Sequence, residues 1–257
     1  MLKNKFTILG CGSSLGAPWI NNYWGSLNQK NVKNIRTRCC AHIFYNGLSI
    51  LIDTSPDIKK QIIDNKIKTV DAIIYTHEHA DQTVGIFELR PFFWKNQKKI
   101  DVFGSKRTIK ALHQKYTFCF FPRHGYRPIM RSNIVKNKFR IQKKSNFIDI
   151  IPFDVGHGLI NATGFLFEKI AYISDCNKVP VKSIKFLSNL NYLIIDCLRK
   201  DKHPSHFNLS EALSLIKKTK PKKAILTNLH VDLDYNLLKK KLPKNIIPAY
   251  DGLFFNF

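Results

Sequence analysis

The amino-acid sequence predicts an α/β fold in which two sheets pack as a sandwich. Apolar, β-branched runs recur along the chain and are separated by glycine and proline, as in strands that end in turns. Helical stretches lie between these runs. The strand-like runs fall into two groups, each interleaved with helices, and this order favours a two-sheet α/β sandwich over an all-β barrel.

Each expected element has a local reason. Apolar and β-branched runs predict strands over residues 6–9, 41–45, 49–52, 72–75, 101–103, 147–153, 164–167, 170–173, 192–197 and 224–227. A helix is expected over 56–65 because Pro56 follows Ser55, and proline suits the first turn of a helix. Ser210 and Glu211 give residues 209–218 the polar opening of an exposed helix. The remaining helix candidates are 105–117, 181–190 and 234–240.

The composition is that of a globular protein. Of the 257 residues, 44% are hydrophobic and 23% are charged, which excludes a disordered or fibrous chain. We find no internal repeat and no linker, so a single domain over 1–257 is expected. No apolar run approaches the roughly 18–20 residues of a membrane span, so the sequence predicts no membrane partner. Nothing in the sequence predicts an oligomeric state.

The N-terminus and the cysteines favour a cytoplasmic location. Residues 1–5 hold no apolar region of the kind that a signal peptide needs. The cysteines are scattered without a CxxC pair, and a chain of this length does not need disulfides for stability. We therefore expect reduced thiols at Cys11, Cys39, Cys40, Cys119, Cys176 and Cys197.

The chain is strongly basic. Its 42 Lys and Arg against 18 Asp and Glu give a formal net charge of +24. Such a balance is typical of nucleic-acid binders, because basic side chains release phosphate counterions. The lysines are spread over the whole length, however, and compositional drift explains that spread better than one binding patch does. Nucleic acid is therefore a possible but not favoured partner, and anionic ligands should be drawn to the surface.

The segment 75–82, Tyr-Thr-His-Glu-His-Ala-Asp-Gln, is the part of the chain most suited to metal binding. It follows the apolar run 71–75, which predicts a buried strand. A strand that ends in His-x-His places two imidazoles at the edge of a sheet, where a metal can bind. The carboxylate of Asp81 can reach the same place as a helix begins. His77, His79 and Asp81 are therefore candidate metal ligands.

This segment resembles the HxHxDH signature of the metallo-β-lactamase fold hydrolases. Further motifs appear in the order found in the branch of cyclic phosphodiesterases of phosphonate breakdown, which is related to tRNase Z. They are Gly10-Cys11-Gly12-Ser13-Ser14, Arg36-Thr37-Arg38, Leu51–Asp57, Leu89-Arg90-Pro91-Phe92, Gly156-His157-Gly158, Tyr172–Asp175 and Pro248–Gly252. The resemblance covers nearly the whole chain and implies a four-layer αββα sandwich.

The resemblance also implies a set of metal ligands. His77, His79 and His157 would bind a first divalent metal, zinc or manganese, through neutral imidazole nitrogens. Asp175 would bridge to a second metal, or complete the first site if there is only one. Asp81 would belong to the second site and orient the nucleophile.

Two positions depart from the signature. The second-site histidine of HxHxDH is replaced by Gln82, and an amide oxygen is a weak ligand beside imidazole. The last histidine of the related phosphodiesterases, in a strand-ending Leu-Thr-His, is replaced by Asn228. His230 follows two residues later and could still point into the site, because residues two apart on a strand face the same way. Alternatively both histidines are lost, which leaves one firm metal site and a doubtful second.

One further histidine stands apart from the metal motif. The resemblance places His206 where these phosphodiesterases keep a histidine that contacts phosphate or protonates the leaving oxygen. An unperturbed imidazole has a pKa of about 6.5, which suits proton transfer.

These residues predict a metal-dependent phosphodiesterase that acts on a small or cyclic anionic phosphodiester. Asp81 and His206 would be its catalytic residues. One alternative is an RNA-processing nuclease of the tRNase Z type, which the charge of +24 suggests, although we find no tRNA-clamping insertion. Another alternative is a metal- or nucleotide-binding protein whose weakened second site has ended catalysis.

Overall fold

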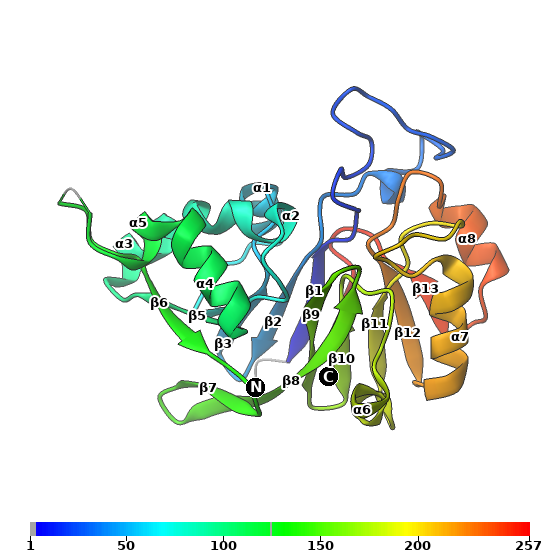
Figure 1. Ribbon diagram of the computed structural model, residues 1–257. Helices are drawn as coiled ribbons and strands as arrows, with labels where there is room; N and C mark the ends of the chain where they lie inside the picture. The colour runs from blue at the N-terminus through cyan, green and yellow to red at the C-terminus, as the bar shows by residue number, and fades with distance from the viewer. Residues whose placement is uncertain (1–3, 124) are drawn as a thin grey trace.

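Two seven-stranded sheets pack face to face, with helices on both outer faces (Figure 1). The computed structural model describes residues 4–123 and 125–257, so the start of the N-terminal stretch discussed above lies outside the described residues. The predicted four-layer αββα sandwich is confirmed. Among the described residues, none of the helices has the length and apolar character needed to span a bilayer.

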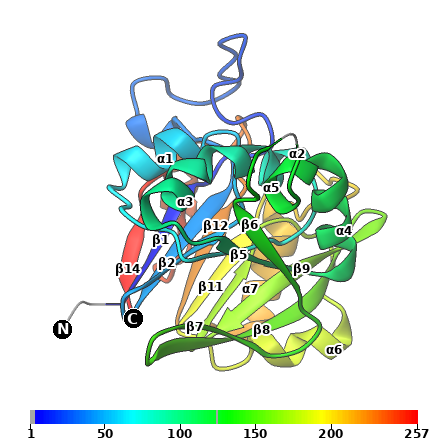
Figure 2. The same cartoon turned by 90° about the vertical axis from the view of Figure 1, so that its left-hand side faces the viewer.

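The first sheet has the strand order β14-β1-β2-β3-β4-β5-β6, and β3 to β6 run parallel. Its strands are β1 (Lys5–Gly10), β2 (Cys40–Tyr45), β3 (Leu48–Ile52), β4 (Ala72–Ile74), β5 (Ile100–Gly104), β6 (Met130–Ile134) and β14 (Phe254–Asn256). Its helices are α1 (Ile58–Asp64), α2 (Ala80–Thr83), α3 (Arg90–Asn96), α4 (Lys106–Lys115) and α5 (Thr117–Phe120). Figure 2 views the molecule from the side of these helices.

The second sheet has the order β13-β12-β11-β10-β9-β8-β7, and β10 to β13 run parallel. Its strands are β7 (Phe139–Lys143), β8 (Asn146–His157), β9 (Ile160–Phe167), β10 (Ile170–Ile173), β11 (Tyr192–Asp196), β12 (Lys223–Thr227) and β13 (Ile246–Pro248). Helices α6 (Val181–Ile184), α7 (Leu209–Thr219) and α8 (Tyr235–Lys241) cover its outer face.

Strand alternation explains why the sandwich has four layers. In β3, Ile50 and Ile52 face the core between the sheets, whereas Leu51 packs under the helices of the first sheet. In β11, Ile194 faces the same inner core, and Leu193 packs toward the helices of the second sheet. Strands that are apolar on both faces need a covering layer on each side, which the helices provide.

Several elements differ from their predicted bounds. The predicted strand 147–153 extends as β8 to His157, because β9 pairs with it down to Ile160. The predicted helix 181–190 is shorter, since α6 ends at Ile184 and one 3-10 turn follows. Strands β6, β7, β13 and β14 and helices α3 and α5 were not predicted, whereas α2 is the helix expected to begin near Asp81. The elements that were not predicted are short or polar. They are stabilised by pairing and packing with distant segments, so the local sequence pattern does not reveal them.

The inner core should dominate stability. Ile43 on β2 is fully buried between Phe6 and Ile50, so Ile43→Ala should lower the free energy of unfolding by about 2–5 kcal/mol. Ile20 is fully exposed, and Ile20→Ala should change the free energy of unfolding by no more than about 0.5 kcal/mol. Urea unfolding of both variants measures the difference, and equal midpoints would contradict the assignment of the core.

Candidate metal centre

The candidate site lies at the edge of the sandwich where strands of both sheets end. The chain after β4 carries His77 and His79, and β8 ends at His157. Asp175 follows β10, and Asp196 is the last residue of β11. Functional groups of α/β proteins commonly gather at the carboxyl ends of parallel strands. The two sheets therefore bring together side chains that are far apart in the sequence.

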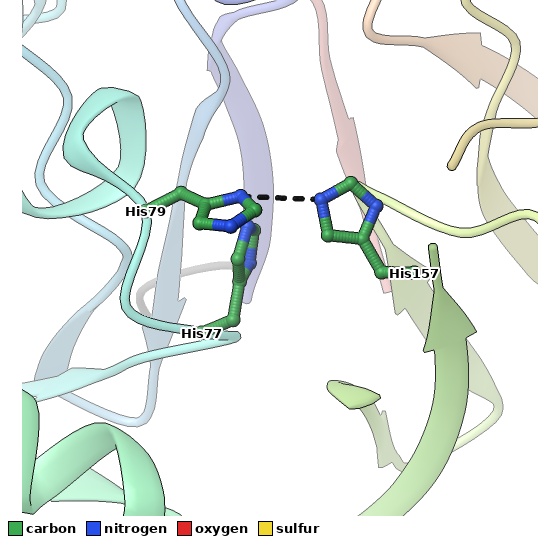
Figure 3. A group of neighbouring side chains, drawn as sticks. All are labelled: His77, His79 and His157. Atoms are coloured by element: carbon green, nitrogen blue, oxygen red, sulfur yellow. Dashed lines mark hydrogen bonds between the residues drawn. The ribbon is translucent and has the colours of Figure 1, made fainter. Parts of the chain in front are cut away.

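Three imidazoles converge at this edge. The ring centroids of His77 and His79 are 4.6 Å apart, and each lies 5.0 Å from the ring of His157. Their ligand nitrogens all lie within 4.8 Å of one another. Figure 3 shows the three rings turned toward a common point, with His79 and His157 facing each other. The structure thus brings together the three residues predicted for the first metal.

Hydrogen bonds fix which nitrogen of His77 faces the site. The hydroxyl of Thr76 donates to the Asp53 carboxylate at 2.9 Å, so its oxygen must accept from His77 Nδ1, 3.0 Å away. His77 Nε2 then carries the lone pair. This nitrogen is buried and has no hydrogen-bond partner among the described residues. A buried unsatisfied nitrogen is costly, and a bound cation would satisfy it.

His157 is oriented in the same manner. Its Nδ1–H donates to the Ser205 carbonyl oxygen at 2.7 Å, which leaves the lone pair on Nε2, 3.2 Å from His79 Nδ1. Burial lowers the pKa of His77 to about 3 and also lowers the pKa of His157, so both rings are held in the neutral form that binds metals. The three imidazoles fit a divalent cation.

Asp175 links this cluster to a second group of side chains. Its ligand atoms lie within 4.8 Å of those of His157 and His206. One carboxylate oxygen of Asp175 accepts from the Gln82 amide at 3.2 Å. Burial, together with repulsion from the Asp175 carboxylate, raises the pKa of Asp81 to about 6. Asp81 nevertheless stands outside both of the convergent groups found among the described residues.

His206 is held by a carboxylate that sequence reasoning missed. His206 Nδ1 donates to Asp196 Oδ2 at 2.7 Å, and Asp196 is fully buried. Burial alone would lower the pKa of His206, but the Asp196 carboxylate outweighs it and raises that pKa to about 9. The amide of Asn228 donates to the other oxygen of Asp196 at 3.1 Å. His206 therefore presents a fixed imidazole beside Asp175, with 4.0 Å between Nδ1 and the nearer carboxylate oxygen.

The interpretation of His230 as a metal ligand assumed that the strand continues through residue 230, and that assumption is wrong. β12 ends at Thr227, and Asn228 has a left-handed backbone with φ of 61°. The alternation of an extended strand is lost there. His230 instead lies 3.1 Å from the Asp232 carboxylate and packs edge-on against Trp19.

Two buried carboxylates of the site, Asp53 and Asp196, were not predicted as functional residues. Both follow the same sequence signal, since each is an acidic residue at the end of an apolar strand-like run. The strand-end position that indicates His77 as a metal ligand is also occupied by acidic residues that orient other side chains. Residues that orient ligands share the strand-end position and could have been found by it.

The hydroxyl of Thr76 offers a test of ligand orientation. Thr76→Val keeps the shape of the side chain and removes the acceptor for His77 Nδ1–H, so zinc affinity should fall about 10–100-fold. Competition with a chromophoric chelator measures the affinity. Thr7→Val is the matched control, because Thr7 is buried in β1 and its hydroxyl has no partner among the described residues. Equal affinities of the two variants would contradict the role of Thr76.

A family model described as "Beta-lactamase superfamily domain" matches residues 49–228, which is more than half of the chain. The chain belongs to the beta-lactamase superfamily. The matched region includes the three imidazoles as well as Asp175, Asp196 and His206. The predicted resemblance to metallo-β-lactamase fold hydrolases is confirmed, and the fold implies that this superfamily member binds a divalent metal.

Solved structures agree with this family. A diphosphatase from the PhnP family is 28% identical with a TM-score of 0.89, and the match covers 100% of this chain and 98% of that chain. Zinc-bound PqqB from Methylobacterium extorquens is 13% identical with a TM-score of 0.78, covering 98% and 100%. Human tRNase Z, short form, is 17% identical with a TM-score of 0.71, covering 98% of each chain. The last two similarities establish the fold alone.

A curated relative carries a different name. An octanoyltransferase from Porphyromonas gingivalis (strain ATCC BAA-308 / W83) is 28% identical over 252 residues, which cover 96% of this chain and 50% of that protein. This superfamily member thus spans about half the length of the curated relative that it matches. The match covers half of that relative, and the name of the relative describes the whole protein.

Proposed function

We propose that the protein is a metal-dependent phosphodiesterase that acts on a small or cyclic anionic phosphodiester. The observation that carries the proposal is the position of the His206–Asp196 pair beside three convergent imidazoles. Hydrolysis of a phosphodiester needs charge neutralisation at phosphorus and a proton for the leaving oxygen. The three imidazoles would hold a cation that neutralises charge at phosphorus, and the His206–Asp196 pair would supply the proton for the leaving oxygen.

The side chains have distinct roles in this proposal. His77, His79 and His157 would hold the cation, which would supply Lewis acidity and lower the pKa of a water molecule. His206 protonates the leaving oxygen, and Asp196 keeps its imidazole in one orientation. Asp81 accepts a hydrogen bond from the attacking water and orients it.

Charge and the similar proteins support an anionic phosphate ester as substrate. The net charge of +24 draws anions toward the surface. The 28% identical structure is that of a protein named a diphosphatase, which also acts on a phosphate compound. RNA is the second candidate substrate, favoured by the same charge and by the tRNase Z fold relatives.

A substrate panel tests the proposal. Protein loaded with zinc or manganese is assayed on a bis-aryl phosphodiester, a cyclic nucleoside phosphodiester, a diphosphate diester and a structured RNA, with the metal-stripped protein as control. Metal-dependent cleavage of the small diesters is expected. Cleavage of RNA alone would favour the nuclease, and metal binding without hydrolysis of any substrate would favour a binding protein.

A further inference from the structure

We infer that this centre holds a single cation, because Gln82 directs an N–H group at Asp175, the carboxylate that a second cation would share, and the amide of Asn228 is engaged with Asp196. The inference rests on the proposed metal centre of His77, His79 and His157. It concerns two positions that carry an amide: Gln82, where the HxHxDH signature has histidine, and Asn228, where the related phosphodiesterases have the histidine of Leu-Thr-His. The structure gives each of these amides a defined partner.

Gln82 directs a donor at Asp175. The Gln82 side chain is 1% exposed, and its Nε2 lies 3.2 Å from Asp175 Oδ1. A carboxylate oxygen only accepts hydrogen bonds, so the NH₂ group must face it. One lone pair of Asp175 Oδ1 is therefore directed at an N–H group. The Gln82 position offers one neutral amide oxygen, which is a weak anchor for a cation beside imidazole.

Asn228 acts in the same way on Asp196. Its Nδ2 donates to Asp196 Oδ1 at 3.1 Å, while Oδ2 accepts from His206 Nδ1 and from the Cys176 backbone N–H, each at 2.7 Å. Both oxygens of this buried carboxylate are thus engaged by N–H groups. Asn228 itself stands in the left-handed conformation, which asparagine and histidine both tolerate.

The two halves of the centre present opposite electrostatics. On one side His77 Nε2 and His157 Nε2 carry lone pairs, and outer hydrogen bonds fix this orientation. On the other side, the Gln82 N–H group faces Asp175 Oδ1, and His206 Nδ1, which donates to Asp196, lies 4.0 Å from Asp175 Oδ2. Positive ends of N–H dipoles repel a cation. Asp175 can complete the ligand set of the first cation, but a second cation beside its Oδ1 would face the N–H group of Gln82.

Counting bound metal tests the inference. The wild-type protein, stripped and reloaded with zinc, should bind one tight equivalent by native mass spectrometry and calorimetry. Loaded with manganese, it should give the paramagnetic resonance spectrum of isolated ions. The double variant Gln82→His with Asn228→His should bind two equivalents and give an exchange-coupled manganese spectrum. Gln82→Met is the matched control, since it restores no nitrogen ligand, and it should still bind one.

Each outcome has a defined meaning. Two tight equivalents in the wild type would overturn the single-cation inference and leave the proposed function standing. No tight equivalent in the wild type would overturn the metal centre itself. A folded double variant that still binds one cation would overturn the role assigned to the amides. The wild-type count decides the number of cations even where the double variant does not fold.

Discussion

The His79→Ala variant should lose its bound cation, and its hydrolysis rate should fall to that of the metal-stripped wild type. Removal of this side chain leaves two imidazoles, whereas catalytic zinc sites commonly use three protein ligands. The His79 side chain is exposed, so its truncation costs little packing energy. Metal content and rate are measured on the same preparation, and folding is checked by thermal unfolding.

A histidine outside the centre provides the control. His113 on α4 lies 2.9 Å from the Ser132 hydroxyl. Its ring packs against the rings of Phe120, in α5, and Phe121. His113→Gln should retain metal and rate. If His79→Ala kept one equivalent of zinc and the wild-type rate, the assignment of the three-imidazole site would be wrong.

The layered architecture could be predicted from the sequence because it depends on local patterns. Continuous apolar runs such as those of β3 and β11 are needed where both faces of a strand are buried, and such runs are visible without tertiary information. Edge strands such as β7 and β14 are different. Their side chains are largely half-exposed or exposed, and pairing with β8 and β1 holds them in place. Their sequences carry a weak signal.

The candidate site could be predicted only in part. His77 and His79 stand directly after a buried strand, so their position at the sheet edge follows from local sequence. For His157, the local pattern ended the strand at 153, and pairing with β9 extends it to the ligand. The partner of His206 could not be read from spacing, because Asp196 comes from a neighbouring strand ten residues earlier along the chain.

The centre also depends on the packing of the two sheets. His77 and His79 follow a strand of the first sheet, whereas His157 ends a strand of the second sheet and Asp175 follows another. The cluster is complete only when the inner core that includes Ile50 and Ile194 has formed. A cation that binds this cluster therefore binds the folded state alone, and it should raise the free energy of unfolding by linkage.

His206→Ala should slow the cleavage of diesters with poor leaving groups about 10²–10⁴-fold, which is the usual contribution of general acid catalysis. Alkoxide leaving groups need a proton as the bond to phosphorus breaks, and His206 is the imidazole that the Asp196 carboxylate holds beside the metal ligands. Activated aryl leaving groups depart without protonation, so their rates should change far less.

The measurement compares kcat/KM for an alkyl diester and a nitrophenyl diester in the wild type and the variant, with zinc content determined for both. Asp196→Asn is the matched positioning variant. It keeps the shape of the partner and removes its charge, and it should show the same selectivity for leaving group with a smaller loss. Equal losses on both substrates in His206→Ala would mean that His206 binds phosphate or supports the loop, because neither role distinguishes leaving groups.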